Sequence, residues 1–376
     1  MRYPEFLNNN GSIGFVAPSF GCATKPYSTA FNMATVKFME MGYNLIVGPN
    51  AYESKGIGIS NTPDACAKEL MDMYLSEDTD ALISCGGGEL MCEILEYLDF
   101  NKLSKAKPKF FLGYSDNTNF TFLQNILTDT ASIYGPCAGS FAAFKWHKSL
   151  QDTWDVLTGK GYETAYFDAN GNITQNKSGN VKAIKYKKIS GYPDFELVSL
   201  KNENNPAPEY NLTEKKELKL YQGDRDIKND LSDSMKLRIE GRLIGGCMDC
   251  LANILGTSFD KVGEFIDKYK NEKIVWFLES CDLNVFDIRR AMWRMDNAGW
   301  FKNVGGFIIG RPMHFNESMM NLDQYKAITG IVGKYNVPII MDADFGHLSP
   351  SMPIISGSYV KVEAIGNDID IFYYLR

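Results

Sequence analysis

The sequence predicts an α/β protein whose first half is a mostly parallel sheet with helices on both faces. Two observations lead to this prediction. In the first half of the chain, short apolar segments typical of buried strands alternate with segments of helical spacing. Such alternation is typical of βαβ units, whose strands run parallel. The length of 376 residues also favours two domains over one.

Each element of the first half carries its own signal. The first predicted helix has a glycine stop at Gly42, and the second begins with Thr62 as a cap and Pro63 at the first helical position. The predicted strands are residues 12–19, 43–48, 80–85 and 108–114. The predicted helices are residues 27–42, 62–76, 86–98 (a glycine loop leading into a helix) and 117–127. Ligands of such sheets bind at the carboxyl ends of the strands.

The middle of the chain changes in character. We divide the sequence into an α/β domain at 1–165, a polar linker or insertion at 166–235, and a second domain at 236–376. The middle part is rich in Asn, Gly and Pro and predicts loops, including 168–180, with weak strands between them. In the last part we expect strands at 236–246, 273–280, 304–310 and 337–347, helices at 247–256 and 285–299, and a closing hairpin over 358–375.

Composition excludes several classes of protein. The net charge of −7 argues against a general nucleic-acid-binding role, which needs basic patches. Because no run of 18 apolar residues occurs, we expect no membrane span. The first twenty residues do not have the pattern of a signal peptide. Eight cysteines without such a signal indicate reduced thiols and a cytoplasmic location.

Ser115 lies where the fourth predicted strand turns into a helix, and it has two interpretations. In the first it is a nucleophile on a strand–turn–helix elbow, with the helix N-terminus and the amide of Asp116 stabilising a developing oxyanion. In the second, Ser115 or Asp116 only caps the helix. Asn117 stands where the pattern G-x-S-x-G has its second glycine. The local sequence leaves both interpretations open.

A serine nucleophile needs a general base, and the chain offers three histidines. His147 precedes a helical stretch, and His314 follows a strand. His347 follows a predicted strand in a loop crowded by Asp, Gly and Pro, and we favour it. A lone histidine in a loop is also compatible with a plain surface position.

Glu279 ends the buried strand at 273–280, where its carboxylate needs a partner to offset desolvation. An imidazole would meet that need, and the carboxylate would hold its tautomer. A salt bridge to Arg289 or Arg290 is the alternative.

Two further motifs have weaker chemical meaning. The glycine run "CGGGE" at 85–89 matches neither the dinucleotide nor the phosphate-binding pattern, but its amides could supply an oxyanion donor. Cys247 and Cys250 form a C-x-x-C pair within a helical pattern of apolar residues. Without a second pair nearby, a zinc site is disfavoured, and we interpret the cysteines as core or near-core.

Taken in order, several stretches resemble the serine peptidases of the L,D-carboxypeptidase family, which includes murein tetrapeptide carboxypeptidases and microcin C self-immunity proteins. The stretches are "IGFVAPS", "GYSDNT", "GRLIGGCMDCLANILGT", "FLES", "AGWFKNVGGFIIGR" and "DFGH". The resemblance covers nearly the whole chain except its polar middle. It implies a flavodoxin-like N-terminal domain and a β-rich C-terminal domain of the swivelling β/β/α type, with the site at their interface.

The resemblance also implies a catalytic machinery. Ser115 would be the nucleophile, His347 the base and Glu279 the residue that orients it, with an oxyanion hole from the amides of Gly87 and Asp116. No metal or other cofactor is implied, and the implied assembly is a homodimer. Further substrate contacts would come from the rest of the glycine run, namely Gly86, Gly88 and Glu89.

Two departures bear on the substrate. Murein carboxypeptidases usually have an Arg-Gly-Gly-Tyr-type loop, where this chain has "CGGGE", and the immunity-type branch more often lacks that arginine. The family's Gly-Gly-Asn-Leu is here Gly-Gly-Cys-Met at 245–248. The long polar middle is also similar to the immunity-type branch, where this region helps to cover the substrate, and Tyr192 and Tyr221 are candidates to stack on a ligand.

We therefore expect a cytoplasmic serine carboxypeptidase or amidase that acts through an acyl-enzyme on a small peptide or aminoacyl-nucleotide substrate. The immunity-type activity on aminoacyl or peptidyl adenylate analogues is favoured, with release of D-Ala from a murein tetrapeptide as the alternative. A non-catalytic small-molecule binding protein on the same fold is the alternative from another class.

Overall fold

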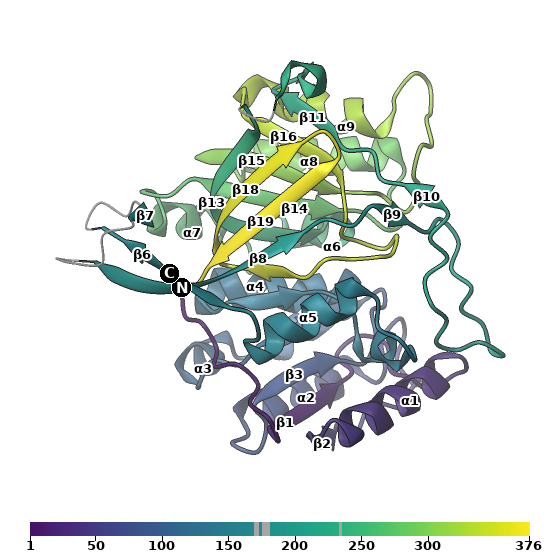
Figure 1. Ribbon diagram of the computed structural model, residues 1–376. Coiled ribbons are helices and arrows are strands. Elements are labelled where there is room, and N and C mark those ends of the chain that lie inside the picture. Colours follow the sequence, from purple (N-terminus) through teal and green to yellow (C-terminus); the bar gives the residue numbers. More distant parts are fainter. Residues whose placement is uncertain (169–172, 175–180, 233–234) are drawn as a thin grey trace.

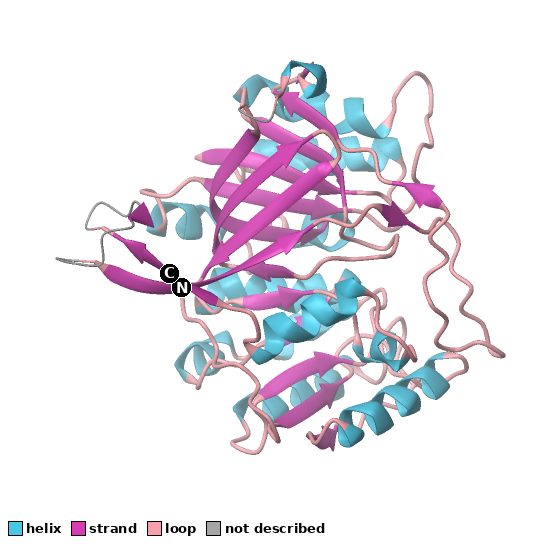
Figure 2. Cartoon of the chain, in the orientation of Figure 1, coloured by secondary structure: helices cyan, strands magenta, loops and turns pink. Residues whose placement is uncertain are grey.

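The chain folds into two layers that each contain a β-sheet. The computed structural model describes residues 1–168, 173–174, 181–232 and 235–376, so the loop predicted at 168–180 lies almost wholly outside the described residues. In Figure 1 the purple and blue N-terminal half forms one layer, and the green and yellow C-terminal half forms the other. Figure 2 shows helices packed around both sheets.

The N-terminal layer contains a six-stranded sheet in the order β17-β5-β4-β3-β1-β2. Its strands are β1 (Ser12–Val16), β2 (Asn44–Val47), β3 (Ala81–Ser84), β4 (Phe111–Gly113), β5 (Ser132–Tyr134) and β17 (Ile354–Ser356). The first five run parallel, and β17 joins antiparallel from the far end of the chain. The order 2-1-3-4-5 is that of flavodoxin-like sheets, so the predicted parallel α/β architecture is confirmed.

Helices cover both faces of this sheet, which explains why its strands are apolar on both sides. The helices are α1 (Tyr27–Glu40), α2 (Pro63–Leu75), α3 (Phe100–Lys105), α4 (Thr118–Thr128) and α5 (Lys148–Thr158). On one face, Phe15 of β1 packs against Phe31 of α1 at 5.3 Å between ring centroids. On the other face, Phe111 of β4 packs against Phe120 of α4 at 4.9 Å.

The predicted ends of two helices are confirmed, whereas one helix has a different form. Gly42, with a φ of +90°, follows the end of α1, and Pro63 is the first residue of α2. After the glycine run the chain forms η1 (Met91–Tyr97), which is a 3₁₀ helix instead of the expected α-helix. The tighter form is common in short connecting segments.

The C-terminal layer is an eleven-stranded sheet in the order β12-β11-β16-β15-β14-β13-β18-β19-β8-β6-β7. Its parallel centre is β13 (Leu237–Cys247), β14 (Ile274–Glu279), β15 (Val304–Gly310) and β16 (Pro338–Ala343). The antiparallel flanks are β6 (Glu163–Phe167), β7 (Ile173–Thr174), β8 (Lys182–Ser190), β11 (Lys219–Gln222), β12 (Arg225–Asp226), β18 (Tyr359–Ile365) and β19 (Asp368–Tyr374). The expected closing hairpin is β18–β19, and this part of the chain is β-rich as expected.

The polar middle, residues 166–235, contains more regular structure than the weak strands predicted for it. The nine-residue strand β8 pairs with β19 on one side and with β6 on the other. Its Ile184 and Ile189 are buried while most of its lysines are exposed, which is why the segment looks polar in sequence. The short strands β9 (Asp194–Phe195) and β10 (Glu214–Lys215) pair with each other, and a long loop connects them.

Helix α4 lies between the two layers and joins them. Phe122 on this helix contacts Trp276 of β14 and Trp300, with ring centroids 6.2 and 5.5 Å away. The helices of the C-terminal layer are α6 (Met248–Ile254), α7 (Val262–Lys268), α8 (Val285–Asn297) and α9 (Gln324–Val332). None of the helices in the described ranges has both the length and the apolar character needed to cross a bilayer.

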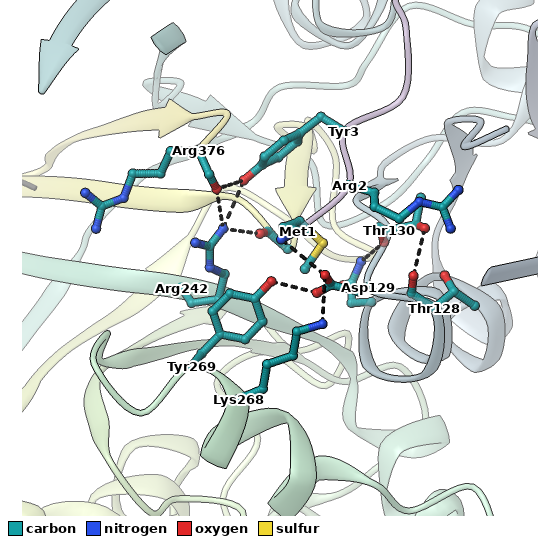
Figure 3. A network of polar contacts seen from close by, with 12 residues as sticks. Met1, Arg2, Tyr3, Thr128, Asp129, Thr130, Arg242, Lys268, Tyr269 and Arg376 are labelled. Atoms are coloured by element: carbon teal, nitrogen blue, oxygen red, sulfur yellow. Dashed lines mark hydrogen bonds and ion pairs between the residues drawn. The ribbon is translucent and has the colours of Figure 1, made fainter. Parts of the chain in front are cut away.

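A buried arginine on β13 ties the two ends of the chain together. Arg242 is 2% exposed, forms an ion pair with Glu272, and donates to the Tyr3 hydroxyl at 2.9 Å and to the Arg376 carbonyl at 3.0 Å. Figure 3 shows Arg242, Tyr3 and Arg376 close together, beside a second cluster around Asp129, which accepts from Tyr269 and pairs with Lys268.

We expect Arg242→Met to lower the free energy of unfolding by about 3 kcal/mol, because it leaves a carboxylate and several acceptors without their buried donor. The denaturation midpoint measures this loss. Arg238→Met on the same strand is the matched control, because Arg238 is 70% exposed where it pairs with Glu363. That exposed pair is worth less than about 1 kcal/mol. Equal shifts in the two variants would contradict the role given to Arg242.

Candidate active site

Ser115 lies on a strained turn between β4 and α4. Its φ is +63°, a left-handed conformation that costs a non-glycine residue roughly 1–3 kcal/mol. The segment η2 (Ser115–Asn117) then leads into α4. Asn117 at the N-cap of α4 makes no side-chain capping bond, and the Ser115 hydroxyl is engaged elsewhere. The serine is therefore held in the geometry of a nucleophile elbow rather than in that of a helix cap.

The structure brings Ser115, His347 and Glu279 into one hydrogen-bonded chain. His347 Nε2 is 2.9 Å from Ser115 Oγ, and His347 Nδ1 is 2.8 Å from Glu279 Oε2. Glu279 is the last residue of β14, and His347 follows β16, so both come from the carboxyl ends of parallel strands. Glu279 is fully buried, whereas the His347 side chain is 12% exposed.

The other predicted partners have other contacts. Arg289 donates to the Lys326 carbonyl at 2.8 Å, and Arg290 pairs with Asp287 at 2.5 Å, so neither pairs with Glu279. Among the histidines, His147 accepts from the Ser149 amide at the start of α5, and His314 lies 3.1 Å from Glu317. Of the three, only His347 contacts Ser115.

Tyr134 was not singled out from the sequence, although it completes the hydrogen-bond network. Its hydroxyl donates to Glu279 Oε1 and accepts from the Ser115 amide at 3.2 Å. Tyr134 ends β5, the neighbour of β4 in the parallel sheet. A polar residue at the end of an adjacent strand is a signal that sequence reasoning could have used.

The charges of this network shift two pKa values in opposite directions. Burial alone would raise the pKa of Glu279, but the His347 charge and the hydrogen bonds from His347 and Tyr134 lower it. Burial alone would lower the pKa of His347, but the Glu279 charge and a hydrogen bond to Cys281 raise it well above its usual value. The pair therefore favours a carboxylate beside an imidazolium whenever a proton reaches the ring.

Asn117, which replaces the second glycine of the elbow pattern, makes hydrogen bonds that hold two loops together. Its Nδ2 donates to the carbonyls of Gly86, at 2.8 Å, and of Tyr114, at 3.0 Å. It thereby ties the glycine run to the elbow. A Cβ at the neighbouring Gly113 would lie 3.0 Å from the Asn117 side chain, so a larger residue there would require Asn117 to shift.

The glycine run passes directly beside the serine. A Cβ on Gly87 would lie 3.1 Å from Ser115 Cβ and 3.2 Å from Ser115 Oγ, so a side chain at this position would push Ser115 from its place. The next residue, Gly88, has a φ of +157°, and a Cβ there would lie 2.1 Å from Ser19 Oγ. The Gly87 carbonyl accepts from the Phe20 amide at 2.7 Å, which fixes the loop in this position.

The Asp116 carboxylate fastens the loops around the elbow. It accepts from the Ser19 hydroxyl, the Met91 amide at 2.8 Å and Asn119 Nδ2 at 2.9 Å. Burial raises the pKa of Asp116, although the hydrogen bonds from Ser19 and the other donors oppose this rise. The Asp116 side chain therefore holds the surrounding loops together, while its backbone lies in the turn that leads into α4.

Two cavities meet at His347. The smaller, of about 240 Å³, is lined by Ser115, His347, Glu89 and the C-x-x-C pair. The larger, of about 520 Å³, is walled by rings and contains two lysines. The rings are those of Tyr27, Tyr114, Trp146 and Tyr210, and the lysines are Lys145 and Lys201. The volume of this larger cavity is within the usual range for small-molecule sites, about 300–1,000 Å³.

The polar middle contributes one tyrosine, Tyr210, to the wall of the larger cavity, and neither Tyr192 nor Tyr221, the two proposed from the sequence, lines it. Tyr192 is 2% exposed, and its hydroxyl donates to Asp152 at 2.9 Å, so the interpretation of Tyr192 as a stacking residue was wrong. Tyr221 lies on β11, where it pairs with Ile339 near the start of β16, and it lines neither of the two cavities. The sequence could not distinguish these tyrosines because their exposure depends on which strand pairs with which.

The cysteines lie near the site without forming a recognisable metal centre. Cys250 Sγ is 3.6 Å from the Ser115 carbonyl, and the Cys247 amide donates to Thr118 at 3.0 Å. Both cysteines are buried, as their apolar helical context suggested, and all eight thiols are free. In the described part of the chain, no three His, Cys, Asp or Glu side chains are placed to hold a metal ion.

Comparison with known proteins finds similarity over most of the chain. Residues 13–135 match the LD-carboxypeptidase N-terminal domain, and residues 240–362 match the LD-carboxypeptidase C-terminal domain. The microcin C7 self-immunity protein MccF of Escherichia coli is 24% identical over 96% of this chain and 92% of its own. A probable murein peptide carboxypeptidase of Bacillus subtilis (strain 168) is 21% identical over 94% and 89%.

A solved structure shares the fold from end to end. The microcin C7 self-immunity protein MccF in complex with aspartyl sulfamoyl adenosine superposes with a TM-score of 0.74 at 19% identity, covering 98% of this chain and 97% of that one. The two matching domain models span both layers of the fold described above. The chain therefore belongs to the LD-carboxypeptidase family.

Proposed function

We propose that this protein is a serine-type carboxypeptidase or amidase that cleaves a terminal amide through an acyl-enzyme. The observation that carries the proposal is the continuous contact from Ser115 Oγ through His347 to the buried Glu279. Such a chain supplies a nucleophile, a base that takes its proton, and a carboxylate that fixes the tautomer of the base. The strained φ of Ser115 further supports a functional turn.

In the proposed reaction, Ser115 Oγ bonds to the carbonyl carbon while its proton passes to His347 Nε2. The amides of Gly87 and Asp116 would donate to the oxyanion, and the close approach of Gly87 to Ser115 supports this assignment. His347 then gives the proton to the leaving nitrogen as the C–N bond breaks. A water molecule, deprotonated by the same imidazole, releases the acyl group and restores Ser115.

For the substrate, we favour aminoacyl or peptidyl nucleotide analogues. The larger cavity supports this choice, because its aromatic rings offer stacking surfaces for a base and its lysines offer charge for a phosphate-like group. The relative MccF binds aspartyl sulfamoyl adenosine, and the glycine run here contains no arginine for a terminal carboxylate. We assign Gly86, Gly88 and Glu89 to contacts with the substrate.

Release of D-Ala from a murein tetrapeptide is the second candidate, favoured by the relative from Bacillus subtilis. The two are separated by incubating the protein with a murein tetrapeptide ending in D-Ala and, in parallel, with aminoacyl sulfamoyl adenosines, with mass spectrometry of the products. We expect cleavage of the nucleotide analogues. Tight binding of either ligand without cleavage, together with a Ser115 that resists serine-reactive probes, would instead indicate a non-catalytic binding protein.

The pH dependence of kcat/KM tests the role of His347. A protonated imidazole cannot accept the serine proton, so activity falls as the pH drops through the pKa of His347. Because Glu279 raises that pKa, we expect the acid limb above about pH 6.5, the ordinary value for histidine. The exposed His314 provides the control, since His314→Gln should leave the profile unchanged. An acid limb at or below the ordinary value would contradict the coupling to Glu279.

A further inference from the structure

The C-x-x-C pair lies where a strand of the large sheet turns into a helix. Cys247 is the last residue of β13, and Cys250 lies in the first turn of α6. The chain later returns as β14, which runs parallel to β13. A C-x-x-C pair within such a βαβ unit is the arrangement found in disulfide oxidoreductases. The fold therefore gives this motif a redox context that the proposed hydrolysis does not use.

The two thiols of the motif contact each other. A hydrogen bond links the Cys247 and Cys250 side chains. Side chains three residues apart in a helical turn lie on the same side of the helix, so the spacing of the motif accounts for this contact. Two sulfur atoms held in this way need little movement to form a disulfide.

Both thiols are reached from the smaller cavity beside Ser115. Four of the eight cysteines line this cavity, namely Cys92, Cys247, Cys250 and Cys281. Cys250 is 7% exposed and Cys247 only 1%. A small reagent that enters the cavity therefore meets Cys250 first.

The protons of the two thiols serve residues of the proposed catalytic machinery. Cys250 Sγ lies 3.6 Å from the Ser115 carbonyl, to which its thiol donates. Cys247 Sγ lies 3.1 Å from Asp249 Oδ2, and the same thiol is also a donor to the Glu279 carboxylate. A change in the state of the two sulfur atoms therefore alters the hydrogen bonds of the nucleophile and of the buried carboxylate.

The surroundings keep both thiols protonated near neutral pH. Burial raises the pKa of Cys247 well above its usual range. The hydrogen bond from Cys247 lowers the pKa of Cys250, but burial and the nearby carboxylates together raise it by more. Because the thiolate is the nucleophile, Cys250 is the first of the two to react, and it reacts faster as the pH rises.

We propose that Cys247 and Cys250 form a reversible dithiol–disulfide site that hydrogen peroxide oxidises. The Cys250 thiolate attacks one peroxide oxygen and the O–O bond breaks, which leaves a sulfenic acid on Cys250. The departing hydroxide takes up the Cys250 proton and becomes water. Cys247 sulfur then attacks the Cys250 sulfur, the S–S bond forms, and the sulfenic hydroxyl leaves with the Cys247 proton as a second water. The thiols lose two electrons, and the peroxide gains them.

Oxidation of this site would also slow the proposed hydrolysis. A disulfide has no S–H donor, so Glu279 and the Ser115 carbonyl would each lose a hydrogen bond. We expect kcat/KM to fall about tenfold, the usual effect of a lost hydrogen bond to a buried charged group. This effect rests on the proposed function, whereas formation of the disulfide does not.

Mass spectrometry of the full chain after exposure to hydrogen peroxide tests the site. The remaining thiols are blocked with iodoacetamide in denaturant before digestion with trypsin. Both cysteines of the motif then lie in one peptide, residues 243–261, which contains no other cysteine. We expect this peptide to lose two hydrogen atoms and to escape alkylation, and dithiothreitol to restore both thiols. Below the pKa of Cys250 the oxidation rate should rise about tenfold for each unit of pH, as the thiolate fraction does.

Two variants connect the disulfide with turnover. Cys250→Ser should lose the disulfide, and the ratio of its kcat/KM after and before peroxide should be close to one. Cys66→Ser is the matched control and should keep both the disulfide and the loss of activity. Cys66 is also buried, but it lies on α2 with its Sγ 3.2 Å from Ser60 Oγ and does not line the cavity.

Each other outcome has a definite meaning. Full alkylation of peptide 243–261, oxygen added to Cys250 without a disulfide, or a bond from either thiol to Cys92 or Cys281 would overturn the site. A disulfide that leaves kcat/KM unchanged would overturn its coupling to Glu279. A chain that forms the disulfide but cleaves no substrate even when reduced would overturn the proposed function and support the site.

Discussion

Replacing Ser115 with alanine is expected to lower kcat by roughly 10⁵-fold or more, since the reaction would lose its nucleophile and its acyl-enzyme route. The measurement is the turnover of the cleaved substrate at saturation, with binding of the same ligand followed separately by calorimetry. Binding should persist, because the two cavities keep their other lining residues. Ser104→Ala, at a serine on α3 away from the triad, is the control and should change kcat less than twofold.

A glycine at the same position gives a second, opposite readout. Ser115 has a φ of +63°, and glycine adopts that conformation without the steric cost. Ser115→Gly should therefore abolish turnover while raising the free energy of unfolding by about 1 kcal/mol. A variant that is both inactive and more stable indicates a residue held in strain for its chemistry. Retained turnover in either variant would remove Ser115 from the mechanism.

The positions of the site residues could be predicted because they depend on local sequence. Apolar runs mark buried strands, and in parallel sheets the ends of such strands meet at one edge. Glu279 ends β14 and His347 follows β16 in the C-terminal sheet, whereas Ser115 follows β4 in the N-terminal sheet, and the packing of the two sheets brings all three into contact. Their catalytic roles, the homodimer and the cytoplasmic location stay predictions.

What could not be predicted depends on contacts between distant segments. Strand β8 belongs to the large sheet because it pairs with β19, about 180 residues further along the chain. Burial of Tyr192 and exposure of Tyr210 to the cavity follow from that pairing and from the loop between β9 and β10. Asn117 broke the expected glycine pattern, yet its amide ties the glycine run to the elbow. A single sequence contains no signal for such partners.

The residue after the nucleophile has a double role. From the sequence, Asp116 offered an amide for the oxyanion and a side chain for capping. In the structure its carboxylate instead fastens Ser19 and Met91, and so it fixes the loops on both sides of the elbow. Rigid loops around the proposed oxyanion hole keep its donors in place, which is the source of their electrostatic effect.

Replacing Glu279 with glutamine is expected to lower kcat by about 10⁴-fold, even though the shape of the side chain is kept. An amide nitrogen facing His347 Nδ1 would donate to it, which places the remaining ring proton on Nε2, directed at Ser115. In that tautomer the ring cannot take the serine proton. If instead the amide oxygen faces the ring, the imidazolium formed in the reaction lacks a counter-charge.

Two further measurements distinguish this mechanism from a general loss of structure. The pKa of His347 should fall in Glu279→Gln, because the charge that raises it is gone, so the acid limb of the residual activity should move to lower pH. Glu264→Gln, at an exposed residue on α7, is the control and should change neither kcat nor the acid limb. If Glu279→Gln kept kcat within tenfold of the parent, the carboxylate would be a structural partner of Tyr134 and not the residue that orients the base.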